Sequence, residues 1–249
     1  MGVLTAIAVS GLPEVRQGHD LAELIVEAGA GFGDGDVVVV AHKVISKAEG
    51  RIRALADVEP GEQALELAAQ TDKDPRHVQA ILEETAVLVR AERGVLICRT
   101  RHGFVCANAG VDASNAPGPD TLVLLPDDPD ASARALRARL RQLTGVSPAV
   151  LVTDSFGRAW RHGQQEVALG CAGLAPLEDW RGRDDSGGRQ LAATWIALAD
   201  QVASTADLTR AKDSREPVVI VGGLARHISA EDGPGAVALI RPPSEDLFS

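Results

Sequence analysis

The sequence predicts an α+β fold in which mixed sheets are flanked by helices. Short runs of β-branched residues alternate along the chain with longer segments that carry apolar residues at helical spacing. Two closely spaced strand-like runs, 94–100 and 103–107, also predict a hairpin around Arg101 and His102. No repeat or low-complexity linker divides the chain, so we predict a single domain over residues 1–249, with a division into two lobes left open.

The chain opens with a predicted β-α-β unit. Residues 3–9 and 36–41 are rich in β-branched side chains, which favour strands. Segment 20–31 between them has apolar residues at helical spacing and a glycine at its end, where helices commonly stop.

The remaining elements follow the same two patterns. Helical spacing predicts helices over 62–70, 75–92, 128–145 and 191–208. In the third of these, Asp130 can cap the start and Gly145 the end, and we interpret the arginines as a solvated face. Apolar runs predict buried strands over 148–154 and 216–224, and a short strand with a tail within 237–248.

Composition restricts the partners that the protein can have. The formal net charge is −10, so the average field of the protein repels phosphate backbones and anionic membrane surfaces. We therefore expect no nucleic-acid partner and no membrane partner. An anionic substrate would need a local cationic pocket.

The cysteines and the apolar runs indicate a cytoplasmic protein. Cys98, Cys106 and Cys171 are an odd number, lie far apart and show no zinc-ligand spacing, which is typical of reduced, buried thiols. No apolar run approaches the roughly 20 residues of a membrane span, and the sequence MGVLTAIAV lacks the basic region of a signal peptide.

The strongest candidate site follows the predicted strand 148–154, in the segment PAVLVTDSFGRAWRHG. Asp154 and Ser155 are consecutive hard oxygen ligands of the kind that Mg²⁺ or Mn²⁺ prefers. Arg158 and Arg161 follow closely and could grip phosphate or carboxylate oxygens. The alternative is a turn in which Asp154 caps a helix and the arginines make surface ion pairs.

A second acid stands in the segment GFVCANAGVDASNA, where Asp112 is the single acidic residue. If Asp112 and Asp154 lie together, their like charges favour a shared cation, so metal binding is a natural use for both. The alternative is a local turn in which Asp112 and Asn115 satisfy backbone groups.

The segment HKVISKAEGR, after the predicted strand 36–41, holds a third candidate. Lys47 could reach the β- and γ-phosphates of a nucleotide, although a solvated lysine is the simpler interpretation. The segment is not a GxxxxGK[ST] loop, and the chain contains no GxSxG or GxGxxG motif. Serine hydrolysis and hydride transfer therefore have little support.

These segments resemble blocks of one known family. The matching blocks are GLPEVRQGHDL, DGDVVVVAHKVISKAEGRIR, ILEETAVLV, GFVCANAGVDASNA, LLPDDPDASA, VLVTDSFGRAWRHGQQEVALGCAGL, EDWRGRDDSGGRQL and PVVIVGGL. They resemble the coenzyme F420-0:L-glutamate ligases, both the CofE type and the amino-terminal domain of the bifunctional FbiB type. The resemblance covers nearly the whole chain.

The resemblance implies a GTP-dependent and divalent-metal-dependent amide ligase. Such an enzyme adds L-glutamate, γ-linked in later rounds, to the deazaflavin precursor coenzyme F420-0 or to its dehydro form. The resemblance also implies an intertwined homodimer with an α+β fold peculiar to the family. It leaves open the number of glutamates, the saturation of the acceptor, a role for K⁺, and whether the chain stands alone or is one part of a bifunctional protein.

The resemblance also assigns roles to individual residues. It implies contacts to GTP for Leu12, Pro13, Glu14, Val15, His42, Lys47 and Asn115. It implies metal binding for Asp112, Asp154 and Ser155, where Ser155 replaces the family's usual threonine and keeps the hydroxyl oxygen.

Three further positions depart from the family pattern. His42 stands where many members have serine, and Gln201 replaces a common glutamate. Lys212 occupies the position of an acid near a second metal ion, so its ammonium group either substitutes for a cation or belongs to a displaced segment.

The implied mechanism has two steps. The γ-phosphate of GTP is transferred to the acceptor carboxylate, and the amine of glutamate then displaces phosphate from the acyl phosphate. Lys47, Arg158 and Arg161 could offset the charge on the transferring group. The alternatives are a nucleotide-binding regulatory homologue without ligase activity and an ATP-dependent ligase for another acid.

Overall fold

The main sheet of the protein combines parallel and antiparallel strands. We describe residues 2–246 from a computed structural model, which confirms the α+β class with mixed sheets. In spatial order the sheet contains β1 (Thr5–Val9), β12 (Val218–Gly222), β2 (Val37–Ala41), β8 (Ala149–Arg158) and β9 (Arg161–Ala172). Strands β2 and β8 run parallel, whereas the other neighbouring strands are antiparallel.

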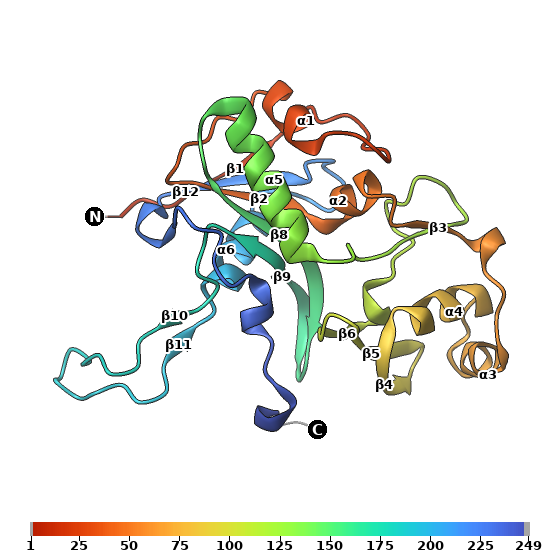
Figure 1. The fold of residues 1–249 in the computed structure, drawn as a ribbon. Coiled ribbons are helices and arrows are strands. Elements are labelled where there is room, and N and C mark those ends of the chain that lie inside the picture. Colours follow the sequence, from red (N-terminus) through yellow and green to blue (C-terminus); the bar gives the residue numbers. More distant parts are fainter. Residues whose placement is uncertain (1, 247–249) are drawn as a thin grey trace.

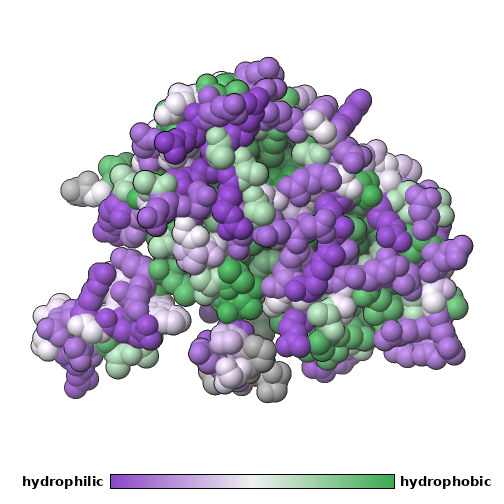
Figure 2. All heavy atoms as spheres, viewed as in Figure 1, coloured by the Kyte–Doolittle hydropathy of each residue, from purple (hydrophilic) through white to green (hydrophobic). Residues whose placement is uncertain are grey.

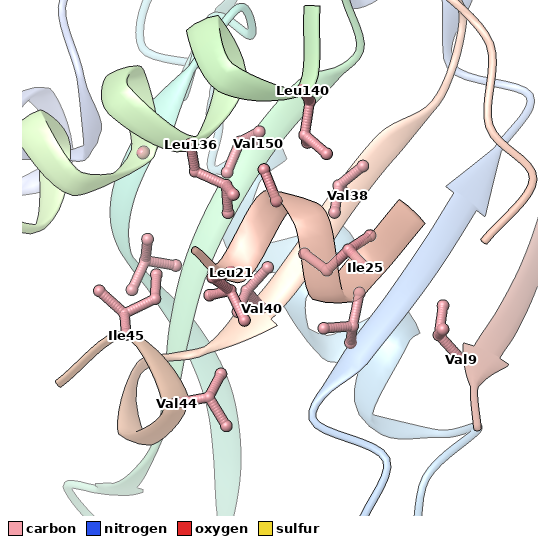
Figure 3. Close-up of a cluster of buried hydrophobic side chains, with 14 of the residues drawn as sticks. Val9, Leu21, Ile25, Val38, Val40, Val44, Ile45, Leu136, Leu140 and Val150 are labelled. Carbon is pink, nitrogen blue, oxygen red and sulfur yellow. The ribbon is translucent and has the colours of Figure 1, made fainter. Parts of the chain in front are cut away.

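Helices cover both faces of this sheet (Figure 1). One face packs against α1 (Leu21–Glu27), α2 (His42–Ala48) and α5 (Pro129–Thr144). Figure 3 shows side chains of these helices meeting the valines of β2 and β8. The other face packs against α6 (Leu198–Asp207). Because both faces are covered, β2 can be a run of valines and need not alternate with polar residues.

A separate hydrophobic cluster forms between residues 55 and 124. It lies where α3 (Glu62–Thr71) and α4 (Pro75–Glu83) pack against a three-stranded sheet of β4 (Thr85–Glu92), β5 (Val95–Thr100) and β6 (Val105–Ala107). A small sheet of β3 (Ile52–Ala54) and β7 (Thr121–Val123) links this region to the main sheet.

Short elements complete the described chain. They are the 3-10 helices η1 (Leu55–Asp57), η2 (Asn108–Gly110), η3 (Ala225–His227), η4 (Ala236–Leu239) and η5 (Pro243–Glu245), and the strands β10 (Glu178–Asp179) and β11 (Trp195–Ile196). Strands β10 and β11 begin an arm that projects from the body of the protein, and its surface is largely hydrophilic (Figures 1 and 2).

The structure confirms most of the predicted elements. The β-α-β opening is present, and Asp20 caps α1 by accepting a hydrogen bond from the backbone N–H of Glu23. The predicted hairpin is formed by β5 and β6, in which Cys98 lies opposite Cys106. The predicted strand 216–224 is β12.

The prediction of a single helix over 75–92 is wrong in its second half. Helix α4 ends at Glu83, and strand β4 begins at Thr85. The segment contains β-branched residues and pairs with β5, where Leu88 lies opposite Cys98 and packs against the separate hydrophobic cluster. Hairpin pairing with the next strand, β5, therefore outweighed the helical spacing.

Three other boundaries also differ from prediction. The helix predicted over 191–208 begins only at Leu198, because Trp195–Ile196 pair with β10 as strand β11. The strand predicted over 148–154 does not end in a turn but continues to Arg158 as one arm of a long hairpin with β9. The short strand predicted within 237–248 is instead the 3-10 helix η4, and residues 247–248 of that segment lie outside the described residues.

Helix α5 has a different cap and a more buried side than predicted. Asp128, and not Asp130, caps its start, while Gly145 ends it with a φ of 76° as expected. Asp130 is buried and accepts hydrogen bonds from the backbone N–H groups of Cys171 and Ala236. Arg137 is also buried, so the interpretation of every arginine on this helix as solvated is wrong.

Arg137 joins helix α5 to two distant backbone segments. Its guanidinium group donates hydrogen bonds to the carbonyl oxygens of Pro148 and Ser229, and its Nη1 atom lies 2.8 Å from Oδ1 of Asp232. One buried side chain therefore ties the helix to the start of β8 and to the segment that precedes η4.

No helix among residues 2–246 is long and apolar enough to cross a membrane.

We expect Arg137→Met to lower the free energy of unfolding by about 3 kcal/mol, because buried acceptors would lose their donor. Urea denaturation monitored by circular dichroism measures this change. Arg141→Met on the same helix is the control, since Arg141 is exposed and should change stability by less than about 0.5 kcal/mol. Equal effects of the two substitutions would contradict the role given to Arg137.

Candidate functional site

The candidate site begins at the edge of the main sheet where the parallel strands β2 and β8 end. Ala41 of β2 pairs with Thr153 of β8, so the next residues, His42 and Asp154, lie at the same edge. In open α/β sheets this carboxyl edge of parallel strands is the usual place for ligands. Two residues that are far apart in the sequence are thus neighbours in space.

His42 points its ring at Asp154. The Nε2 atom of His42 lies 3.5 Å from Oδ1 of Asp154 and forms no hydrogen bond at that distance, although the side chain is only 1% exposed. The other ring nitrogen, Nδ1, lies 3.3 Å from Oγ of Ser46 one helical turn away. The imidazole is therefore fixed by α2 and directed at the acid on β8.

Asp112 faces the next residue of the same helix. The Nζ atom of Lys43 lies 2.5 Å from Oδ2 of Asp112, and the backbone N–H of Ser114 donates to Oδ1 of Asp112 at 2.7 Å. Hydrogen bonds between the backbones of Asp112 and Val123 hold the acid in place. Burial alone would raise the pKa of Asp112, but the hydrogen bonds from Lys43 and Ser114 outweigh it and leave the pKa below its ordinary value.

The structure thus brings the two predicted acids to one turn of α2. Asp154 contacts His42, and Asp112 contacts Lys43, which are consecutive residues. Among residues 2–246, no cluster of three or more His, Cys, Asp or Glu side chains could by itself hold a metal ion. A divalent cation at this turn would therefore depend on the two carboxylates and on oxygens of a substrate.

Lys47 meets the predicted nucleotide-binding turn. Its side chain is almost buried, and Nζ lies 2.5 Å from Oε1 of the exposed Glu14. Val15 is buried and Leu12 packs against the main core, while Pro13 and Glu14 face outward. The interpretation of Lys47 as a solvated lysine is therefore wrong.

Ser155 points to the opposite side of β8 from Asp154. Its hydroxyl group donates a hydrogen bond to Oε1 of Glu166, which lies opposite on β9, at 2.7 Å. Lys212 in turn donates a hydrogen bond to the same hydroxyl oxygen. The ammonium group of Lys212 therefore lies beside Ser155.

Glu166 is a functional candidate that the sequence did not reveal. The residue is buried, and its Oε2 atom lies 3.1 Å from Nη2 of Arg210, with Lys212 3.6 Å from Oε1. The signal that could have indicated this role is that Glu166 lies opposite Ser155 in the β8–β9 hairpin. The sequence alone does not give the register in which the two strands pair. Gln201, the third departure, is exposed on α6.

The two predicted arginines lie away from the turn of α2. Arg158 of β8 lies opposite Arg161 of β9 in the strand register, at the exposed tip of the hairpin. Arg158 is four residues beyond Asp154, which is about 13 Å along an extended strand. Its guanidinium group donates to the carbonyl oxygen of His162 at 2.8 Å.

Asn115 lies three residues beyond Asp112 in a left-handed conformation with a φ of 54°.

The three cysteines are free and buried, as the sequence predicted. Burial, with a smaller contribution from the charge of Asp154, raises the pKa of Cys106 to about 12. Burial and the charge of Asp130 likewise raise the pKa of Cys171 to about 12. The thiols are therefore held in their neutral form.

A family model described as F420-0:Gamma-glutamyl ligase matches residues 11–223, which defines the class as a ligase family. The chain therefore belongs to the F420-0:gamma-glutamyl ligase family.

Relatives of known function match the chain over its whole length. A coenzyme F420:L-glutamate ligase from Methanopyrus kandleri is 47% identical, and the match covers 100% of both chains. A protein of the same name from Methanothermobacter thermautotrophicus is 42% identical over 100% of this chain and 99% of its own. A third, from Haloarcula marismortui, is 44% identical over 98% of this chain and 95% of its own.

We expect the native protein to resist iodoacetamide at pH 8, because the reactive form of a cysteine is the thiolate and burial suppresses it. In urea all three cysteines should be labelled, which mass spectrometry of tryptic peptides can measure. When the protein unfolds, the pKa of each of these thiols returns to its ordinary value of 9.0. Above that pH the unfolded chain loses protons that the folded protein keeps, so the free energy of unfolding should fall as pH rises from about 9. Fast labelling of native Cys106 would contradict this environment.

Proposed function

We propose that this protein is a GTP-dependent ligase that joins L-glutamate to coenzyme F420-0 or its dehydro form through an amide bond. One observation carries the proposal: in a member of this ligase family, Asp154 contacts His42 and Asp112 contacts Lys43, the first two residues of α2. Relatives that match the full chain are named coenzyme F420:L-glutamate ligases, which supports the same acceptor and the same amino acid.

The proposed reaction proceeds in two balanced steps. A carboxylate oxygen of the acceptor attacks the γ-phosphorus of GTP, the bond to the β-phosphate oxygen breaks, and GDP leaves. The amine nitrogen of glutamate then attacks the acyl carbon, loses a proton and expels inorganic phosphate. The chain's own contribution is to position three anionic substrates and to offset their charge.

Asp112 and Asp154 fit a divalent cation. Both are hard oxygen donors at one turn, and the buried His42 Nε2 atom beside Asp154 has no hydrogen-bond partner. Asp112 and Asp154 would hold a Mg²⁺ or Mn²⁺ ion, which would supply positive charge to offset the charge that develops on the transferring phosphoryl group. Lys43 would have to leave Asp112, and its ammonium group would then be free to contact a phosphate.

Ser155 fits this role less well than the two aspartates. Its hydroxyl proton is directed at Glu166, and its oxygen accepts a hydrogen bond from Lys212. We propose that the ammonium group of Lys212 supplies positive charge on this side of β8 in place of a second divalent ion. Arg210 holds Glu166 from the other side and keeps the arrangement rigid.

The nucleotide is proposed to lie against the turn that contains Leu12, Pro13, Glu14 and Val15. Lys47 already contacts Glu14 in this turn, and its nearly buried stem leaves the ammonium group little freedom. Such a fixed lysine can contact phosphate without a large loss of side-chain entropy. His42 and Asn115 are proposed to border the same nucleotide, whereas Arg158 and Arg161 would contact substrate only if it extends along the hairpin.

We propose that two copies of the chain form a homodimer. The arm that begins with β10 and β11 projects from the body of one chain and is suited to contact a second copy (Figure 1). Light scattering should then give twice the chain mass of 26.0 kDa.

We expect Asp154→Asn to lower kcat/KM by at least about 100-fold while the fold stays intact, because the cation and the phosphates would lose a charged ligand. Mass spectrometry of the glutamylated product, with GTP and Mn²⁺ varied, measures the loss. Asp57→Asn, at an exposed acid on η1, is the matched control and should be as active as the parent protein.

Full ligation by the Asp154→Asn protein would refute the assignment of the metal site. Turnover with ATP in place of GTP, or on another acid, would favour the alternative ligase. Binding of GTP without any product, with or without K⁺, would favour a regulatory homologue.

A further inference from the structure

Three rings gather beside the proposed site. The chain contains only four phenylalanines and no tyrosine, yet Phe104 and Phe156 meet edge to face with ring centres 6.2 Å apart. His102 stacks on Phe104 with ring centres 5.7 Å apart and an interplanar angle of 26°. We call His102, Phe104 and Phe156 the aromatic tier. Two of the four phenylalanines of the chain therefore lie in one cluster.

The aromatic tier lies on the same face of β8 as Asp154. Val150 and Val152 of β8 point into the core beneath α1, α2 and α5. Because side chains alternate along a strand, Asp154 and Phe156 continue on that face. Phe156 therefore lies about 7 Å along the strand from the acid that faces His42.

The aromatic tier is not part of the packed core. None of its residues belongs to the hydrophobic clusters of the described chain, and each ring is only half-buried. Rings that serve only to fill a core are normally enclosed, whereas rings that bind a ligand keep one surface accessible. The partial exposure therefore favours a binding role.

A hollow of about 220 Å³ opens next to the tier. Its lining includes His102 and Phe104 of the tier and the apolar side chains of Leu169, Val237 and Ile240. The short helix η4 borders it, in a region where Figure 2 shows hydrophobic atoms gathered at the surface. Ligand pockets usually measure about 300–1,000 Å³, so the hollow can hold one end of a ligand and not the whole of it.

The acids that line the hollow are already paired within the chain. Asp127 contacts Arg101 and Arg51, at 2.5 Å and 3.4 Å. Asp128 caps α5, and Asp130 accepts hydrogen bonds from backbone N–H groups. The hollow therefore has no unbalanced acid that would require a cation, and an uncharged, planar group suits its apolar walls.

We propose that the aromatic tier and this hollow form the acceptor subsite, where the planar deazaflavin ring system of the substrate stacks. The inference rests on the proposed function. With the ring system on the tier, the rest of the acceptor extends along the face of β8 toward Asp154, where its carboxylate meets the phosphate of the nucleotide. The two ends of one substrate are thus recognised by one strand.

Kinetic measurements on Phe104→Leu and Phe156→Leu test the subsite. Leucine keeps most of the volume but removes the ring, so the KM for the acceptor should rise about 5- to 10-fold. The KM values for GTP and glutamate should stay within about twofold, because the tier lies beyond Asp154. Phe104→Tyr, which keeps a ring, should have the acceptor KM of the parent protein. Phe32→Leu is the control, because Phe32 packs against the main core.

Equilibrium binding separates this inference from the proposed function. Deazaflavin fluorescence, titrated with protein in the absence of GTP, should show weaker binding to both leucine variants, whose folding is checked by thermal unfolding. An unchanged acceptor KM and unchanged binding in both variants would overturn the subsite while ligation by the parent protein still stood. A parent protein that binds the deazaflavin through the tier but forms no product would refute only the ligase.

Discussion

The parallel pairing of β2 with β8 is the constraint on which the candidate site depends. The pairing of Ala41 with Thr153 places His42 and Asp154 at one edge of the sheet. A shift of one residue would turn Asp154 to the other face, because side chains alternate along a strand. Asp112 reaches the same edge from a different part of the chain, through its contact with Lys43.

Charge is balanced locally in a strongly acidic protein. The formal net charge is −10, yet lysines and arginines pair with the acids of the site: Lys43 with Asp112, Lys47 with Glu14, and Arg210 and Lys212 with Glu166. Each pair lowers the cost of placing a carboxylate near other carboxylates. Each pair also places an ammonium or guanidinium group at the candidate site, so the local charge there is less negative than the net charge of the chain.

Successive residues of β8 serve different surroundings. Asp154 faces His42 of α2 and Phe156 faces Phe104, whereas Ser155 faces Glu166 and Lys212 in the segment after α6. The alternation of a single strand therefore separates the acid from the serine that follows it. Lys212 also fits this division, because it contacts Ser155 and Glu166 and not Asp154.

The sequence by itself determined the α+β class, most helices and strands, the free and buried cysteines and the residues that matched a family, because short-range spacing and composition encode these features. Only the tertiary structure decided that 85–92 is a strand, that Arg137 is buried, and that Glu166 joins the site. It also separated Arg158 and Arg161 from the turn of α2. Most of these outcomes depend on contacts between residues far apart in the chain, and no local pattern specifies such contacts. The same holds for the contact between Lys43 and Asp112, which are 69 positions apart.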